Sequence, residues 1–62
     1  MSRWRCCVWV PASPVQDAGT FDLVVNAYSE AEARDQALAE LERRGFSRLW
    51  LAFAVMRVKR LE

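Results

Sequence analysis

The charged side chains of this sequence are the first candidates for a functional site, because acids and bases occupy different parts of the chain although their charges nearly cancel. The 62-residue chain has nine Lys and Arg, eight Asp and Glu, and a formal net charge of +1. Between Asp17 and Glu42 lie seven acids and one base, Arg34, whereas eight bases and one acid, Glu62, lie outside. Net charge therefore favours no partner, but the separation allows one face to bind a partner of opposite charge.

The other reactive side chains predict neither an enzyme nor a metal site. The chain has no His, no glycine-rich phosphate loop and no nucleophile with a base nearby, and exposed carboxylates lack the burial that makes general acids. Its cysteines, Cys6 and Cys7, are neighbours that point to opposite faces of a strand, so we expect reduced thiols. A zinc site would need further Cys or His ligands. We expect no metal, no cofactor and no small-molecule substrate.

Composition predicts one small globular domain over residues 1–62. A chain this short buries only about 60% of the surface of its unfolded form, so it needs dense apolar packing. Its 53% hydrophobic residues, with three Trp and three Phe, can supply that packing and exclude disorder. No run approaches the ~18 apolar residues of a membrane span, and Pro11 interrupts any signal peptide. We expect a soluble cytoplasmic protein.

Alternating apolar residues predict strands over residues 3–10, 20–28 and 48–61. Prolines and a glycine predict a loop over residues 11–19. The apolar parity of the third strand changes after Val55, so we expect a β-bulge near Ala54–Met56. The residues expected to face the core are Trp4, Cys6, Val8, Val10, Phe21, Leu23, Val25, Ala27, Leu49, Leu51, Phe53 and Val55, followed by Met56 and Val58.

A capping box predicts a helix that begins after Ser29, since the Ser29 hydroxyl can accept from the amide of Glu32 while the Glu32 carboxylate reaches back to the Ser29 amide. Gly45 supplies the stop. Spacing of 100° per residue places Ala33, Ala37, Leu38 and Leu41 on the inner face and Glu32, Asp35, Gln36, Ala39, Glu42 and Arg43 on the outer face.

These elements predict an α+β fold in the order strand–strand–helix–strand. A right-handed crossover leaves the second and third strands parallel to each other, and the apolar first strand suits the place between them. The prediction is a three-stranded antiparallel sheet of order 2-1-3, with one helix packed on one face. The other face of the sheet then has no cover in this chain.

The uncovered sheet face is one candidate binding surface. Basic and aromatic residues on an open sheet are typical of single-strand nucleic-acid platforms, and a protein partner or a homodimer that closes two open faces would also suit them. Alternatively, strand parity is misassigned and the tryptophans belong to the core. The candidate residues are Arg3, Arg5, Trp9, Tyr28, Arg48 and Trp50.

The acidic middle of the chain is the other candidate surface. Its carboxylates could imitate the phosphates of a nucleic acid toward a basic protein groove. The alternative is a solvated helix with internal i,i+4 pairs, Glu30–Arg34 and Glu40–Arg44. The candidate residues are Asp17, Asp22, Glu30, Glu32, Asp35, Glu40 and Glu42.

The block Phe21–Ala33 (FDLVVNAYSEAEA), the aromatic Leu49-Trp50-Leu51 and the absence of catalytic motifs resemble the small anti-CRISPR proteins that phages encode. The resemblance implies a non-enzymatic inhibitor that binds a Cas protein of a type I CRISPR effector complex in the cytoplasm of the host bacterium and blocks target DNA. It transfers no individual binding residue. We expect the domain itself to be a monomer or a homodimer. Our leading hypothesis is such an inhibitor acting through the acidic surface. The alternative is a binding module that uses the open sheet face, and a reduced ribosome-associated α+β domain is a third reading.

Overall fold

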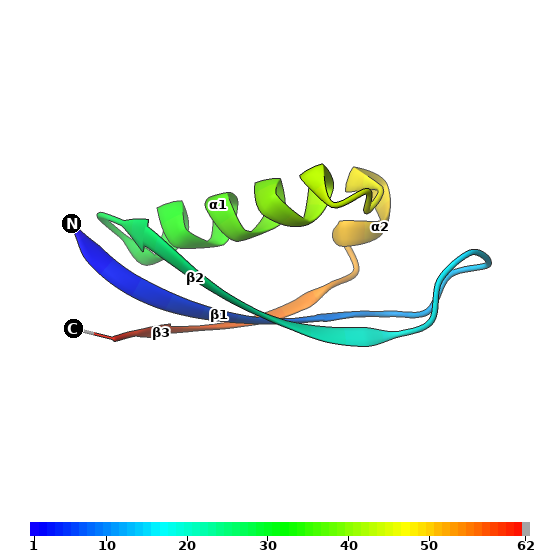
Figure 1. The fold of residues 1–62 in the computed structure, drawn as a ribbon, viewed down its shortest axis with the longest axis horizontal. Helices are drawn as coiled ribbons and strands as arrows, with labels where there is room; N and C mark the ends of the chain where they lie inside the picture. Colours follow the sequence, from blue (N-terminus) through cyan, green and yellow to red (C-terminus); the bar gives the residue numbers. More distant parts are fainter. Residues whose placement is uncertain (62) are drawn as a thin grey trace.

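The computed structural model describes residues 1–61, and Glu62 lies outside the described part. Its three strands form one antiparallel sheet in the order β2-β1-β3, and the long helix α1 lies across one face (Figure 1). The predicted α+β class and sheet order are therefore confirmed. The elements in chain order are β1 (Ser2–Val10), β2 (Gly19–Ala27), α1 (Glu30–Arg43), the short α2 (Arg48–Leu51) and β3 (Val55–Arg60).

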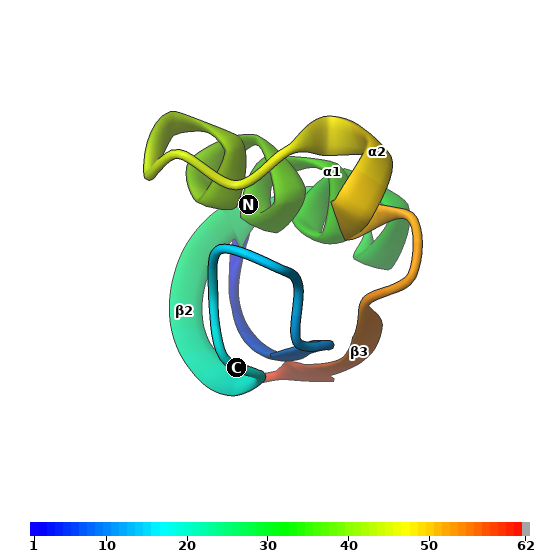
Figure 2. The same cartoon turned by 90° about the vertical axis from the view of Figure 1, so that its right-hand side faces the viewer.

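Strands β1 and β2 form a long hairpin in continuous register, from Ser2 opposite Ala27 to Val10 opposite Gly19. The loop between them is closed by two backbone hydrogen bonds between Ser13 and Gln16. The sheet curls around the side that α1 covers, so its other side is convex (Figure 2). The hairpin end reaches beyond the helices and leaves the loop without cover (Figure 1).

Both predicted ends of α1 are confirmed. The Ser29 Oγ accepts a hydrogen bond from the Glu32 amide at 3.2 Å. The Glu32 carboxylate reaches back to the amide of Tyr28, at 3.4 Å, rather than to that of Ser29. At the other end, Gly45 has a φ of 105°, and the Phe46 amide donates to the Leu41 carbonyl at 3.2 Å. This is the hydrogen bond of a Schellman motif, which needs a left-handed residue that glycine adopts without strain.

The core lies between the concave side of the sheet and α1. The inward residues predicted for β1, β2 and α1 are confirmed, since all are buried or packed against the buried cluster. Ala33 and Ala37 are fully buried, so α1 lies close to the sheet. Phe21 and Phe46 meet edge to face, 5.0 Å between ring centroids. The buried cluster comprises Cys6, Val8, Val10, Leu23, Ala27, Ala33, Ala37, Leu41, Phe46 and Leu51.

The predicted third strand over residues 48–61 is wrong in its first half. Residues 48–51 form helix α2, the strand begins at Val55, and its register with β1 is continuous, without the expected bulge. Leu51 is buried, but Leu49 and Phe53 are 83% and 65% exposed. Val55 is opposite Trp9, on the side of the sheet away from α1, so it does not face the core. Helix α2 interrupts the chain before β3 begins, so the alternation of residues 48–54 does not continue into β3. In β3, Met56 and Val58 pack against the core.

Candidate functional site

The open face is the side of the sheet turned away from α1 (Figure 1). Residues directly opposite each other in an antiparallel pair share a face, so the register fixes its members. Along the central strand β1 these alternate with the buried Cys6, Val8 and Val10. The open face consists of Arg3, Arg5, Cys7 and Trp9 of β1, Thr20, Asp22, Val24 and Asn26 of β2, and Val55, Arg57 and Lys59 of β3.

Positive charge dominates the open face, where residues 1–61 contribute four bases and one acid. Arg5 lies directly opposite Lys59, and Arg57 lies opposite Cys7 in the next row. Like charges directly opposite each other destabilise a sheet. Arg57 and Lys59 form no ion pair with any residue of the described part of the chain. The open face therefore gathers positive charge, and the repulsion within it lowers the stability of the fold.

The one acid of the open face is held by a base. Arg5 donates to Asp22 from Nε at 3.4 Å and from Nη2 at 3.0 Å. Hydrogen bonding and the charge of Arg5 lower the pKa of the Asp22 carboxyl, and the same contact raises the pKa of Arg5. Both side chains are exposed, so the pair adds little to stability. Its effect is to fix the direction of the Arg5 guanidinium and to leave the bases of β3 uncompensated.

An aromatic ring lies at one end of the basic surface. Trp9 is 45% exposed and has Thr20 on one side and Val55 on the other. Going along β1 from Trp9, the next rows contain Cys7 and then Arg5. A flat ring beside a run of cations is the arrangement on which nucleic-acid bases stack while phosphates are bound.

Part of the predicted open-face set is placed elsewhere. Arg3, Arg5 and Trp9 lie on the open face, and Tyr28 is exposed just after the end of β2. Placing Arg48 and Trp50 on the sheet was wrong, because both belong to α2. The Trp50 indole is half-buried there, and its Nε1 donates to the Pro11 carbonyl at 2.8 Å. This tryptophan therefore has a structural partner.

Sequence reasoning missed two bases of the open face, Arg57 and Lys59. Both alternate with Met56 and Val58, which are predicted to face the core, but neither belongs to the predicted candidate site. The signal was present, because inward Met56 and Val58 on a three-stranded sheet require the alternating bases to face outward. With these bases included, the face is more basic and less aromatic than predicted.

The seven candidate acids do not share one surface. Asp22 lies on the open face with Arg5, and Asp17 lies in the loop between β1 and β2. Glu30 pairs with Arg34 at 3.8 Å. Glu40 pairs with Arg43 and, at 3.5 Å, with Arg44, so both predicted i,i+4 pairs of the helix are confirmed.

Three acids remain on the outer side of α1. Glu32 accepts from the Tyr28 amide and from the Gln36 side chain. Asp35 and Glu42 line a hollow beside α2 and form no ion pair within residues 1–61. Arg48 of α2 lines the same hollow, but within residues 1–61 it forms an ion pair with neither carboxylate.

Residues 1–61 contain no group of three or more His, Cys, Asp or Glu side chains that could hold a metal ion. The two thiols are free; Cys6 is buried and Cys7 is half-buried on the open face. Burial raises the pKa of the Cys6 thiol, and the charge of Arg34 opposes that shift. Over the same part of the chain, neither helix has the length and apolar character to cross a bilayer.

The chain was compared with protein-family models, curated proteins and solved structures, and none of them matches it.

Proposed function

We propose that this protein is a non-enzymatic binding module whose open face binds single-stranded nucleic acid. The observation that carries the proposal is the like-charged pair of Arg5 and Lys59, directly opposite each other with Arg57 in the next row. Such a pair lowers the stability of the fold. A phosphate bound between the two cations would attract both and offset their mutual repulsion.

The spacing of the rows suits an extended strand of nucleic acid. Alternate residues repeat about every 7 Å along a β-strand, so Trp9, Cys7 and Arg5 mark three successive rows. A base stacked on Trp9 would have its phosphate near Arg57, and the next phosphate would lie near Arg5 and Lys59. Contacts of this kind are tolerant of sequence, since every base has a flat face and every nucleotide a phosphate.

The test is a fluorescence titration of the full chain with single-stranded oligonucleotides at several salt concentrations. Single-strand binding weakens with salt with a slope of roughly 0.7 per phosphate contacted. We expect quenching of Trp9 fluorescence, a negative salt slope and weaker binding of duplex of the same length. No binding, or binding that does not depend on salt, contradicts the proposal.

A second candidate function is the phage inhibitor of a type I CRISPR effector complex. It is supported by the exposed Asp35 and Glu42, which lie without bound bases on the outer side of α1. These carboxylates would contact a basic groove that otherwise holds DNA phosphates. The test is capture of purified effector complex by three proteins. They are the wild type, the double variant Asp35→Lys, Glu42→Lys, and the control variant Glu30→Lys. Equal capture by all three would rule out an acidic decoy on this side of α1.

A further inference from the structure

The outer edge of β2 differs from the outer edge of β3. Because β1 is central, both neighbours present unpaired backbone N–H and C=O groups along their free sides. Strand β3 is six residues long and carries three bases, Arg57, Lys59 and Arg60, which discourage pairing with another strand. Strand β2 is nine residues long and has one charge, that of Asp22, which Arg5 neutralises. The edge of β3 is thus protected and that of β2 is not.

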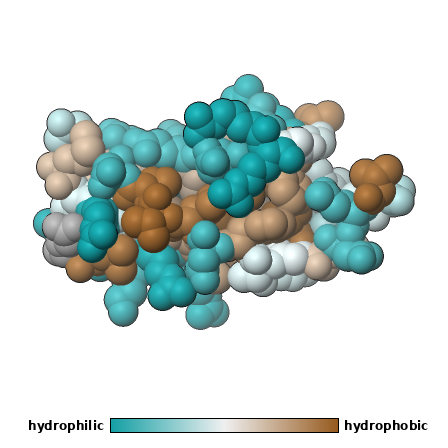
Figure 3. Space-filling model, in the orientation of Figure 1, coloured by the Kyte–Doolittle hydropathy of each residue, from teal (hydrophilic) through white to brown (hydrophobic). Residues whose placement is uncertain are grey.

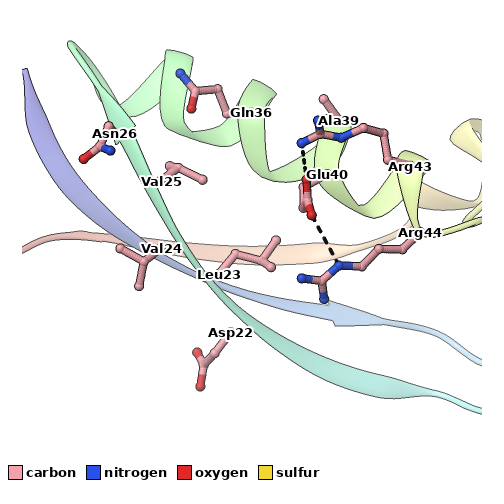
Figure 4. A pocket seen from close by; sticks show the side chains of 10 residues that line it. All are labelled: Asp22, Leu23, Val24, Val25, Asn26, Gln36, Ala39, Glu40, Arg43 and Arg44. Atoms are coloured by element: carbon pink, nitrogen blue, oxygen red, sulfur yellow. Dashed lines mark hydrogen bonds and ion pairs between the residues drawn. The ribbon is translucent and has the colours of Figure 1, made fainter.

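A groove of about 780 Å³ lies beside β2, between this strand and α1 (Figure 4). Leu23 and Val25 of β2 contribute to its wall, as do Gln36, Ala39 and Glu40 of α1. Seen from the β2 side, hydrophobic residues show between the hydrophilic side chains of α1 and those below the sheet (Figure 3). The unprotected strand therefore adjoins a surface that is partly apolar.

We propose that two copies of this chain pair through β2, antiparallel about a two-fold axis, to form one six-stranded sheet with the two α1 helices side by side. A C2 interface must be self-complementary. With the axis beside Val24, Asp22 lies opposite Asn26 of the second copy on the open side, so an amide meets a carboxylate. On the inner side, Leu23 lies opposite Val25 of the second copy.

Charge on α1 is complementary in the same arrangement. The flank of α1 above the groove carries Glu32 toward its N-terminal end, followed by Gln36. Toward its C-terminal end it carries Arg43 and Arg44, which share the single carboxylate of Glu40, so this end keeps an excess of positive charge. Two such helices placed antiparallel bring Glu32 of each copy toward Arg43 of the other. The strand register and the helix charges therefore favour one and the same two-fold arrangement.

Dimerisation through β2 would also stabilise a domain of this small size. Three of the ten buried hydrophobic residues are alanines, so the core has little volume, and domains this small often gain stability by oligomerisation. The dimer does not depend on nucleic-acid binding. It would, however, place the two open faces on the same side of one continuous sheet.

The test is sedimentation velocity of the full chain over a range of concentrations, with two valines compared. Val24 and Val55 are 59% and 58% exposed, and both lie on the open face, one on each edge strand. Val24→Glu places two carboxylates at the axis, yet within each copy the new carboxylate lies opposite Arg5 and keeps the fold. We expect it to raise the dissociation constant of the dimer by about tenfold or more, whereas Val55→Glu leaves the dimer unchanged.

A charge exchange provides a second, independent variant. Arg43→Glu sets like charges against each other across the helices and weakens the dimer, and the double variant Glu32→Arg, Arg43→Glu restores it. Circular dichroism checks that each variant is folded. A wild-type chain that stays monomeric, a dimer insensitive to both Val24→Glu and Arg43→Glu, or a dimer dissociated by Val55→Glu alone overturns the inference, the last by placing the interface at β3 or between open faces.

Discussion

Arg5 of β1 and Lys59 of β3 lie directly opposite each other on the open face. A cation paired with an acid would stabilise the sheet at this position, whereas two cations destabilise it. Asp22 binds Arg5 from the other side, but its single charge cannot neutralise both bases. The excess charge is therefore a property of the folded surface and is not visible in a net charge of +1.

Lys59→Glu should make the protein more stable and a weaker nucleic-acid binder. The substitution turns a repulsive cross-strand pair into an attractive one, with a gain of roughly 0.2–1 kcal/mol in the free energy of unfolding. The same change removes a phosphate contact and adds a repulsive charge, so affinity for an oligonucleotide should fall and the salt slope should decrease. Urea unfolding and a fluorescence titration measure the two effects.

Arg60→Glu is the matched control for Lys59→Glu. Arg60 is the next residue of β3, is exposed and is opposite Trp4, so it belongs to the other side of the sheet. The Arg60→Glu substitution changes the net charge by the same amount as Lys59→Glu but leaves the open face unaltered. If both variants weaken binding to the same extent, the effect is one of overall charge and the open face is not the site.

Trp9 and Trp50 should have separable roles. Trp9→Ala removes the exposed ring of the open face and should cost about 1–3 kcal/mol of oligonucleotide binding, if one base stacks on it. Trp50→Phe keeps the ring contact with Phe53 but removes the donor to the Pro11 carbonyl. It should lower the free energy of unfolding by about 1–3 kcal/mol, because a half-buried carbonyl loses its partner, and leave binding unchanged. Loss of binding in Trp50→Phe, with Trp9→Ala unaffected, would contradict this assignment.

The sequence predicted the hairpin and α1 well because each depends on local signals that agree. Ser29 begins the helix, Gly45 ends it, and the inner residues of β1 and β2 alternate without interruption. The error lay in residues 48–54, where Leu49, Leu51 and Phe53 alternate as in a strand. A short apolar run has the same pattern in a strand and in a single helical turn. Only the tertiary need to bury Leu51 against the end of the core distinguishes them.

The candidate site was predictable in part for the same reason. Arg3, Arg5 and Trp9 belong to β1, whose predicted inward residues are confirmed, so these three residues lie on the predicted side of the sheet. Arg48 and Trp50 depended on the misassigned segment, so they were misplaced with it. The division of the acids could not be foreseen, because the pairing of Asp22 with Arg5 depends on a cross-strand register that joins residues 17 positions apart.

Asp22→Asn should have opposite effects on stability and binding. Contact with Arg5 lowers the pKa of Asp22 below its ordinary value of 3.8, so the folded state favours the ionised form. The stabilisation is present above that ordinary value and is lost as the pH falls through the lowered pKa. Unfolding curves of the wild type and of Asp22→Asn should therefore differ slightly at neutral pH and converge in acid. Binding of an oligonucleotide at neutral pH should strengthen, because the open face loses its one acid. Curves that diverge further in acid would contradict the linkage.

Ser29→Ala should destabilise the fold, whereas Ser47→Ala should not. Ser29 accepts a hydrogen bond from Glu32 at the start of α1, and loss of such a cap costs about 0.5–2 kcal/mol. Ser47 precedes α2 in the equivalent position but makes no side-chain capping hydrogen bond. Urea unfolding of the two variants gives the comparison. Equal destabilisation would mean that the serine at 47 caps α2 in solution.

Cys7 provides a chemical probe of the open face, because it lies between Asp22 and Arg57 on the central strand. A thiol reagent should modify Cys7 of the folded protein, whereas Cys6 is fully buried and has a raised pKa, so it should react only on unfolding. Saturation with a single-stranded oligonucleotide should slow the modification of Cys7, because bound phosphates cover its row. Cys7→Ser is the control that removes the fast reaction. An unchanged rate at saturation would place the nucleic acid elsewhere, since a ligand that bridges Trp9 and Arg5 must pass over the thiol between them.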